Sequence, residues 1–119
     1  MNARVMVGMT RWTHGRIRRL ARRQDRLWGI VLGDVFCPAR MSAHGDWDTS
    51  GMAETARTAG LKVALQTPAY LTSRNFRQTI DLIRLLQQRS LLDLVLLQDM
   101  GLLSILADQR SETPVCWTV

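Results

Sequence analysis

An acid, a thiol and a guanidinium follow an apolar run in the first third of the chain. Residues 27–32 read Leu-Trp-Gly-Ile-Val-Leu, and after Gly33 come Asp34, Cys37 and Arg40. A thiolate acts as a nucleophile or metal ligand, a carboxylate as an acid or base, and a guanidinium as an anion-binding fork. If the run is a buried strand of a parallel sheet, these side chains lie at its carboxyl end, where α/β folds bind ligands.

Polar residues also follow the other apolar runs. Because the carboxyl ends of parallel strands meet at one edge of a sheet, we expect a pocket there. Its expected members are Asp34, Cys37, Arg40, Gln66 and Asp99, with Trp12, Thr67 and Gln98 beside them. The alternative is that these residues belong to solvated loops, because every strand-to-helix loop needs polar side chains.

Cys37 has two interpretations from its residue type. It is a nucleophile if His14 or His44 acts as its base, although no local motif pairs them and loop histidines are often solvated. Otherwise Cys37 and Cys116 are small buried hydrophobic residues, which is the commonest environment of a free cysteine.

Two carboxylates, Asp34 and Asp99, are candidates for an acid and base pair. Asp99 is equally explained as the N-cap of the helix that follows it. The sequence contains no phosphate-binding Gly-rich loop, Gly-x-Ser-x-Gly elbow or His-Glu-x-x-His motif, so no common catalytic motif decides between these roles.

The spacing of apolar residues predicts alternating strands and helices. The expected strands are 4–8, 27–32, 61–65, 91–97 and 115–119, and the expected helices are 16–27, 46–59, 73–86 and 102–107. Gly60 is expected to end the second helix as its C′ residue, and Ser73 to cap the third. Repeated strand-helix units predict the α/β class with a parallel sheet.

Two architectures fit this order: the N-terminal half of a TIM-like (βα) barrel, or a five-stranded doubly wound sheet. The chain stops on its fifth strand, whereas a doubly wound domain would add a helix to cover it. We therefore expect residues 1–119 to form a single partial (βα) domain, truncated after the fifth strand or completed by a partner.

The charge of the chain is uneven. Of its 16 basic residues, nine lie in residues 1–40, where there are two acidic residues. Arginines on the expected helix 16–27 either bind RNA phosphates or form the solvated face of an outer helix. No apolar run is long enough to span a membrane and no signal peptide is visible, so we expect a cytoplasmic protein without a membrane span.

The segment 32–40, Leu-Gly-Asp-Val-Phe-Cys-Pro-Ala-Arg, resembles a loop of the collagenase-like peptidase family of unassigned catalytic type. Within that family it is most similar to the UbiV proteins, whose loop reads Leu-Gly-Glu-x-x-Cys-Ser-Lys-Arg. The likeness continues, in order, at Val7-Gly8, Trp12, Gly45-Asp46-Trp47, Gly60-Leu61-Lys62-Val63 and Gln98-Asp99-Met100-Gly101-Leu102. The chain departs from the family loop at Asp34, which replaces Glu, and at Pro38-Ala39, which replace Ser-Lys.

The resemblance implies a barrel-type domain of about twice this length. It also implies a four-iron four-sulfur cluster, with Cys37 as one ligand and the other three in a segment that this chain does not contain. Such clusters are held by four cysteine thiolates, and Cys116 matches no ligand of the family. The implied partner is a UbiU-like subunit or the missing half-barrel.

The function implied by the resemblance is that of an accessory subunit of oxygen-independent hydroxylation in ubiquinone biosynthesis. The same family suggests two alternatives, a tRNA or rRNA hydroxylation factor and a collagenase-like peptidase. A fourth possibility is a non-catalytic fragment that only associates with another half-barrel. Whether the chain itself is an enzyme stays open at this stage.

Overall fold

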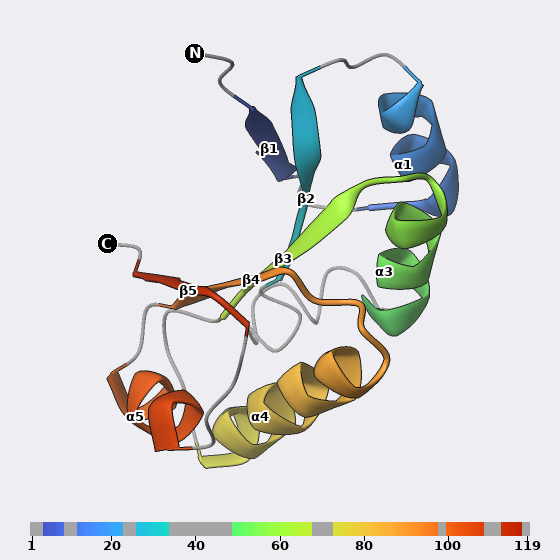
Figure 1. Cartoon of the computed structure of the whole chain (residues 1–119). Coiled ribbons are helices and arrows are strands. Elements are labelled where there is room, and N and C mark those ends of the chain that lie inside the picture. Colours follow the sequence, from blue (N-terminus) through green and yellow to red (C-terminus); the bar gives the residue numbers. More distant parts are fainter. Residues whose placement is uncertain are drawn as a thin grey trace.

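Five parallel strands form one sheet, and their order across the sheet is their order in the sequence (Figure 1). This computed structural model describes residues 4–8, 12–22, 26–33, 49–67, 73–97, 100–108 and 113–117. The strands are β1 (Val5–Gly8), β2 (Leu27–Gly33), β3 (Lys62–Gln66), β4 (Leu94–Leu97) and β5 (Val115–Trp117). Each strand pairs in parallel with the next, so β1 and β5 are the edges.

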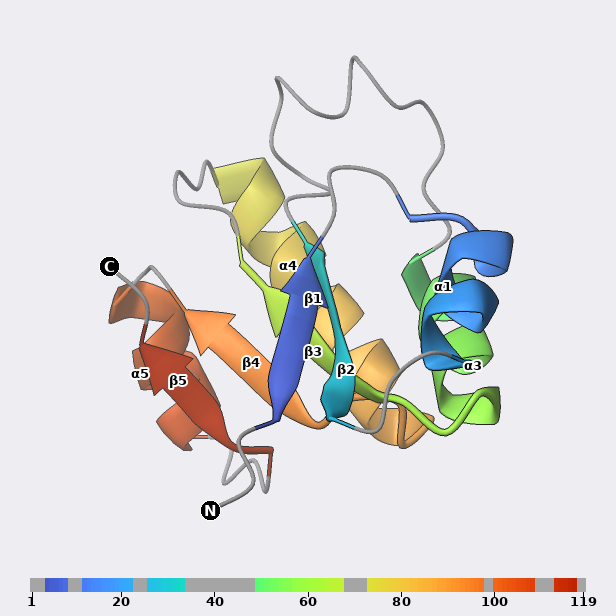
Figure 2. The ribbon, with the colours of Figure 1, turned by 90° about the horizontal axis from the view of Figure 1, so that it is seen from above.

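Helices connect successive strands on one side of this sheet (Figures 1 and 2). They are α1 (His14–Ala21), α3 (Thr49–Thr58), α4 (Ser73–Gln88) and α5 (Met100–Asp108). Crossovers between parallel strands are right-handed, and here every strand is added in the same direction. The described helices therefore all pack against the same face of the sheet.

The hydrophobic core lies between that face and the helices. Alternate residues of the three central strands point into it and are buried: Ile30, Leu32, Val63, Leu65, Val95 and Leu97. The helices contribute buried residues to the same cluster: Ile17, Ala53, Ala56, Ile83, Leu86, Leu102 and Leu106. Continuous apolar strands, and helices that bury one face against them, are the pattern expected of a parallel α/β sheet.

The opposite face of the sheet is covered by none of the described helices. One row of neighbouring residues across it is Gly33, Gln66, Leu96 and Cys116. On the two edge strands, large apolar side chains are exposed: Val5 at 55%, Met6 at 40% and Val115 at 37%. Both edge strands thus present apolar side chains, whereas Ala64 and Leu96 on the uncovered face are buried.

The α/β class and the parallel sheet are confirmed, with strands at each of the five expected places. The first helix differs from expectation, because it begins at His14 and ends at Ala21 rather than covering 16–27. Leu27 belongs to β2, and its spacing from the apolar residues of α1 is coincidental. Cys116 is exposed rather than buried, because β5 is an edge strand.

Helix ends follow local signals in the chain. Gly60 has the expected left-handed conformation, with φ of 83°, and Leu61 N–H donates to the Ala56 carbonyl across the end of α3. Ser90 has the same role after α4, with φ of 56°. None of the helices in the described ranges is long and apolar enough to cross a membrane.

Two glycines let β2 and β3 approach closely. A Cβ on Gly29 would lie 2.6 Å from the carbonyl carbon of Lys62 and nearer still to its oxygen. A Cβ on Gly33 would lie 2.8 Å from the Cβ of Gln66. Real Cβ atoms do not tolerate such distances to a strand backbone, so both positions require glycine.

The close approach predicts that Gly29→Ala destabilises the protein. The added methyl group must displace the β3 backbone, and overpacking of this kind costs about 1–3 kcal/mol of unfolding free energy. Gly15→Ala in α1 is the matched control, because nothing lies within 4 Å of its Cβ position. Denaturant unfolding should show that Gly15→Ala is neutral or stabilising by up to about 1 kcal/mol. Equal stability of the two variants would contradict the close approach.

Candidate functional site

The carboxyl edge of the sheet is where the sequence places its candidate site. β2 ends there at Gly33, directly before Asp34, and Gly33 pairs with Gln66 at the end of β3. Gln66 is half-buried on the face that the described helices leave uncovered, between Gly33 and Leu96. Gly33, the last described residue before the segment that carries Cys37, therefore lies at the end of an interior strand, beside Gln66.

Most of the predicted site residues lie outside the described residues. They are Asp34, Cys37, Arg40, His44, Gln98 and Asp99. Their expected grouping, the nucleophilic role of Cys37 and the acid and base pair therefore stay predictions. Of the five expected pocket members, Asp34, Cys37, Arg40, Gln66 and Asp99, the structure describes Gln66.

Thr67 and Trp12 have structural roles at this edge. The side chain of Thr67 is fully buried, and its hydroxyl donates to the carbonyl of Leu96 over 3.3 Å. Trp12 is 3% exposed, and its indole N–H donates to the carbonyl of Val31 over 2.8 Å. Both side chains bond to a carbonyl of a neighbouring strand. Because they are buried there, neither lines an open pocket, contrary to the expectation from the sequence.

His14 is the first residue of α1, and its side chain contacts α3. Its Nδ1 lies 2.5 Å from the hydroxyl oxygen of Thr55, which in turn donates to the carbonyl of Gly51. Nδ1 of His14 and the Thr55 hydroxyl therefore share a hydrogen bond, whose donor is set by the tautomer of the ring. The interaction joins the first residue of α1 to α3.

The described residues include no group of three or more His, Cys, Asp or Glu side chains that could hold a metal ion. Cys116, the described cysteine, lies exposed on β5. An iron-sulfur cluster needs four thiolates, and the whole sequence has two cysteines. This chain therefore does not fit a complete cluster by itself.

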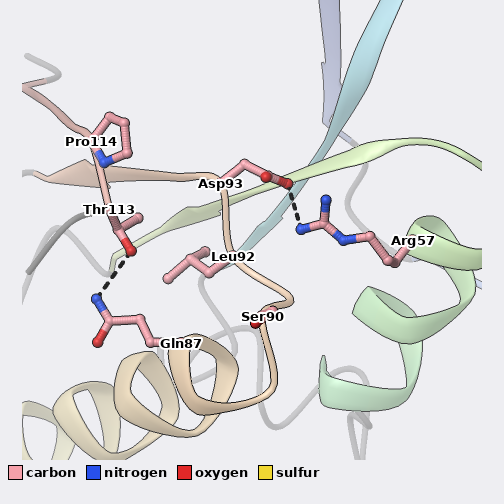
Figure 3. A pocket seen from close by; sticks show the side chains of 7 residues that line it. All are labelled: Arg57, Gln87, Ser90, Leu92, Asp93, Thr113 and Pro114. Atoms are coloured by element: carbon pink, nitrogen blue, oxygen red, sulfur yellow. Dashed lines mark hydrogen bonds and ion pairs between the residues drawn. The ribbon is translucent and has the colours of Figure 1, made fainter.

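A polar cluster that sequence reasoning missed lies at the amino edge of the sheet (Figure 3). The Asp93 carboxylate accepts a hydrogen bond from the backbone N–H of Val63 and another from Nη2 of Arg57, both at 2.8 Å. Nε of Arg57 is buried without an acceptor. Asp93 thus joins the start of β4 to β3 and α3. The sequence signal for this role was that Asp93 interrupts the apolar run 91–97.

The same cluster borders a cleft of about 520 Å³. Across the cleft, the side-chain amide of Gln87 donates to the hydroxyl of Thr113 over 3.2 Å (Figure 3). Since the charge of Arg57 is balanced by Asp93, this pair offers no net charge to a ligand. We interpret this edge as the one that stabilises the sheet, as amino-terminal edges do in barrel folds.

Comparisons with protein-family models, with curated proteins and with solved structures find no match to this chain.

Asp93→Ala should lower the free energy of unfolding by about 2–3 kcal/mol, because it leaves Arg57 and the Val63 N–H without their acceptor. Glu54→Ala is the matched control. Its pair with Arg89 spans 3.5 Å between side chains that are 57% and 51% exposed, and such surface pairs contribute about 0.5 kcal/mol. Urea titrations of the two variants measure the difference. If both lose the same stability, Asp93 does not hold the amino edge.

Proposed function

We propose that this chain is a UbiV-like accessory subunit of oxygen-independent hydroxylation in ubiquinone biosynthesis, related to the collagenase-like peptidase family. The observation that carries the proposal is the position of β2. It is an interior strand, and its carboxyl end leads straight into the segment from Asp34 to Arg40 that resembles the family loop. In parallel folds, that position is where ligands are bound.

The order of the strands favours a barrel-type domain over a doubly wound sheet. Doubly wound sheets reverse their strand order at a switch point and carry helices on both faces. Here the order is sequential, and the described helices occupy one face. The partner that we propose is a UbiU-like subunit or a second half-barrel, which would pair with the edge strands β1 and β5.

The proposed cofactor is a four-iron four-sulfur cluster. Cys37 would supply one thiolate, and by the resemblance the other three would come from a segment that this sequence does not contain. When bound, such a cluster provides one-electron redox chemistry. The role of this chain's own residues is to hold Cys37 at the end of β2, where Gly33 permits close contact with β3.

Cys37→Ser should abolish ubiquinone synthesis without oxygen, since serine is a poor ligand for iron-sulfur clusters. The test uses a strain that makes ubiquinone anaerobically, lacks this gene and carries the wild-type or variant gene on a plasmid. Quinones are extracted from anaerobic and aerobic cultures and quantified. Loss is expected in anaerobic cultures alone.

Cys116→Ser is the matched control, because this exposed cysteine lies on β5 and matches no ligand of the family. It should restore anaerobic ubiquinone as well as the wild type does. Full restoration by Cys37→Ser, or unchanged anaerobic ubiquinone in the deletion strain, would refute the proposed function.

A further inference from the structure

A groove of about 740 Å³ runs between α1 and α3 on the outer helical layer. The two helices lie side by side in both views (Figures 1 and 2). His14, Arg18 and Arg22 line the α1 side at intervals of four residues. Residues four apart on a helix share one face, so these side chains form a single stripe along the groove.

The two guanidinium groups of this stripe are available to a ligand. Arg18 and Arg22 are exposed, and neither has an ion-pair partner within the described ranges. Helix α1 contains no acidic residue that could neutralise them. Guanidinium groups one helical turn apart can both donate to a single phosphate, in the geometry that arginine adopts with such anions.

The α3 side of the groove is small and polar. Gly51 and Ala59 leave space, and Glu54 and Thr58 add a carboxylate and a hydroxyl. Glu54 is also near Arg89, but that exposed pair at 3.5 Å is weak and leaves the carboxylate open to other donors. A carboxylate and a hydroxyl are the groups that bind the hydroxyls of a polyol.

The hydrogen bond between His14 and Thr55 sets the shape of the groove. Because Nδ1 of His14 is bonded to the Thr55 hydroxyl, its Nε2 is the ring atom that remains for another partner. This bond joins the two walls of the groove, and it is present without a ligand. A site that is formed in advance loses less entropy on binding.

We propose that this groove binds a small phosphate monoester that carries hydroxyl groups, such as a sugar phosphate. Arg18 and Arg22 bind the phosphate, and Glu54 and Thr58 bind the hydroxyls. The volume suits a small molecule. The described lining includes no Phe, Tyr or Trp, and its one ring, that of His14, is bonded to Thr55, which favours a sugar phosphate over single-stranded RNA.

This inference does not depend on the proposed function. It needs neither Cys37 nor a partner, because every residue that lines the site belongs to α1 or α3 or directly follows one of them. The test titrates the full chain with ribose 5-phosphate at fixed ionic strength, with backbone amide shifts recorded by NMR. We expect saturable binding of one molecule per chain, with the largest shifts in α1 and α3.

The double variant Arg18→Gln/Arg22→Gln should weaken binding of ribose 5-phosphate by about tenfold or more, because it removes both charge-assisted contacts. Arg19→Gln/Arg77→Gln is the matched control, with the same change in net charge on exposed residues that do not line the groove. Its affinity should stay within about twofold of the wild type, since neither guanidinium lines the groove and exposed charges are screened at physiological salt.

Glu54→Gln tests the hydroxyl side of the site. The wild type should bind ribose 5-phosphate more tightly than inorganic phosphate, and Glu54→Gln should reduce this preference because the amide accepts hydrogen bonds less strongly than the carboxylate. Inorganic phosphate itself should bind the variant at least as well as the wild type.

Three results would overturn the proposal. The first is no saturable binding of ribose 5-phosphate by the folded wild type. The second is equal weakening by the groove variant and the control variant, which would indicate a general charge effect. The third is tighter binding of a single-stranded RNA oligonucleotide at the same residues, with steep salt dependence, which would make the groove an RNA contact.

Discussion

The close pairing of β2 with β3 is the constraint on which the arrangement of this protein depends. Its register runs without a break from Gly29 opposite Lys62 to Gly33 opposite Gln66, and both glycines are needed because the β3 backbone occupies the space of a side chain. The pairing makes β2 an interior strand. It places Gly33, the residue before Asp34, beside Gln66 at the carboxyl edge of the sheet.

The remaining contacts divide the molecule into parts with different roles. At the amino edge, the Asp93 carboxylate joins β3, β4 and α3 through contacts to Val63 and Arg57. At the carboxyl edge, Trp12 and Thr67 bond to strand carbonyls and close the core. The helices cover one face, and their outer side carries the groove between α1 and α3.

The strands could be predicted from sequence because buried parallel strands are continuous apolar runs bounded by polar loops. The end of α3 was predictable as well, since Gly60 is the usual residue in a left-handed C′ position. Ser90 fulfils the same role after α4, but serine gives no such signal. The first helix was extended too far because Leu27 continues its apolar spacing while belonging to β2.

Contacts between distant segments could not be predicted. Asp93 meets Arg57 across 36 residues, and His14 meets Thr55 across 41, and neither pair forms a local motif. The grouping of the predicted site residues stays a prediction, because Cys37 and most of its expected neighbours lie outside the described residues. What the structure adds is the position of Gly33, the residue before Asp34, and of Gln66, which lies opposite Gly33 on β3.

The order of the strands is the central claim, and through-space proton contacts measured by NMR test it most directly. Residues 29–33 should show cross-strand contacts to residues 62–66, with Gly33 near Gln66. In a doubly wound sheet of the common order 2-1-3-4-5, β1 would separate these two strands. Contacts between β1 and β3, with none between β2 and β3, would therefore contradict the account.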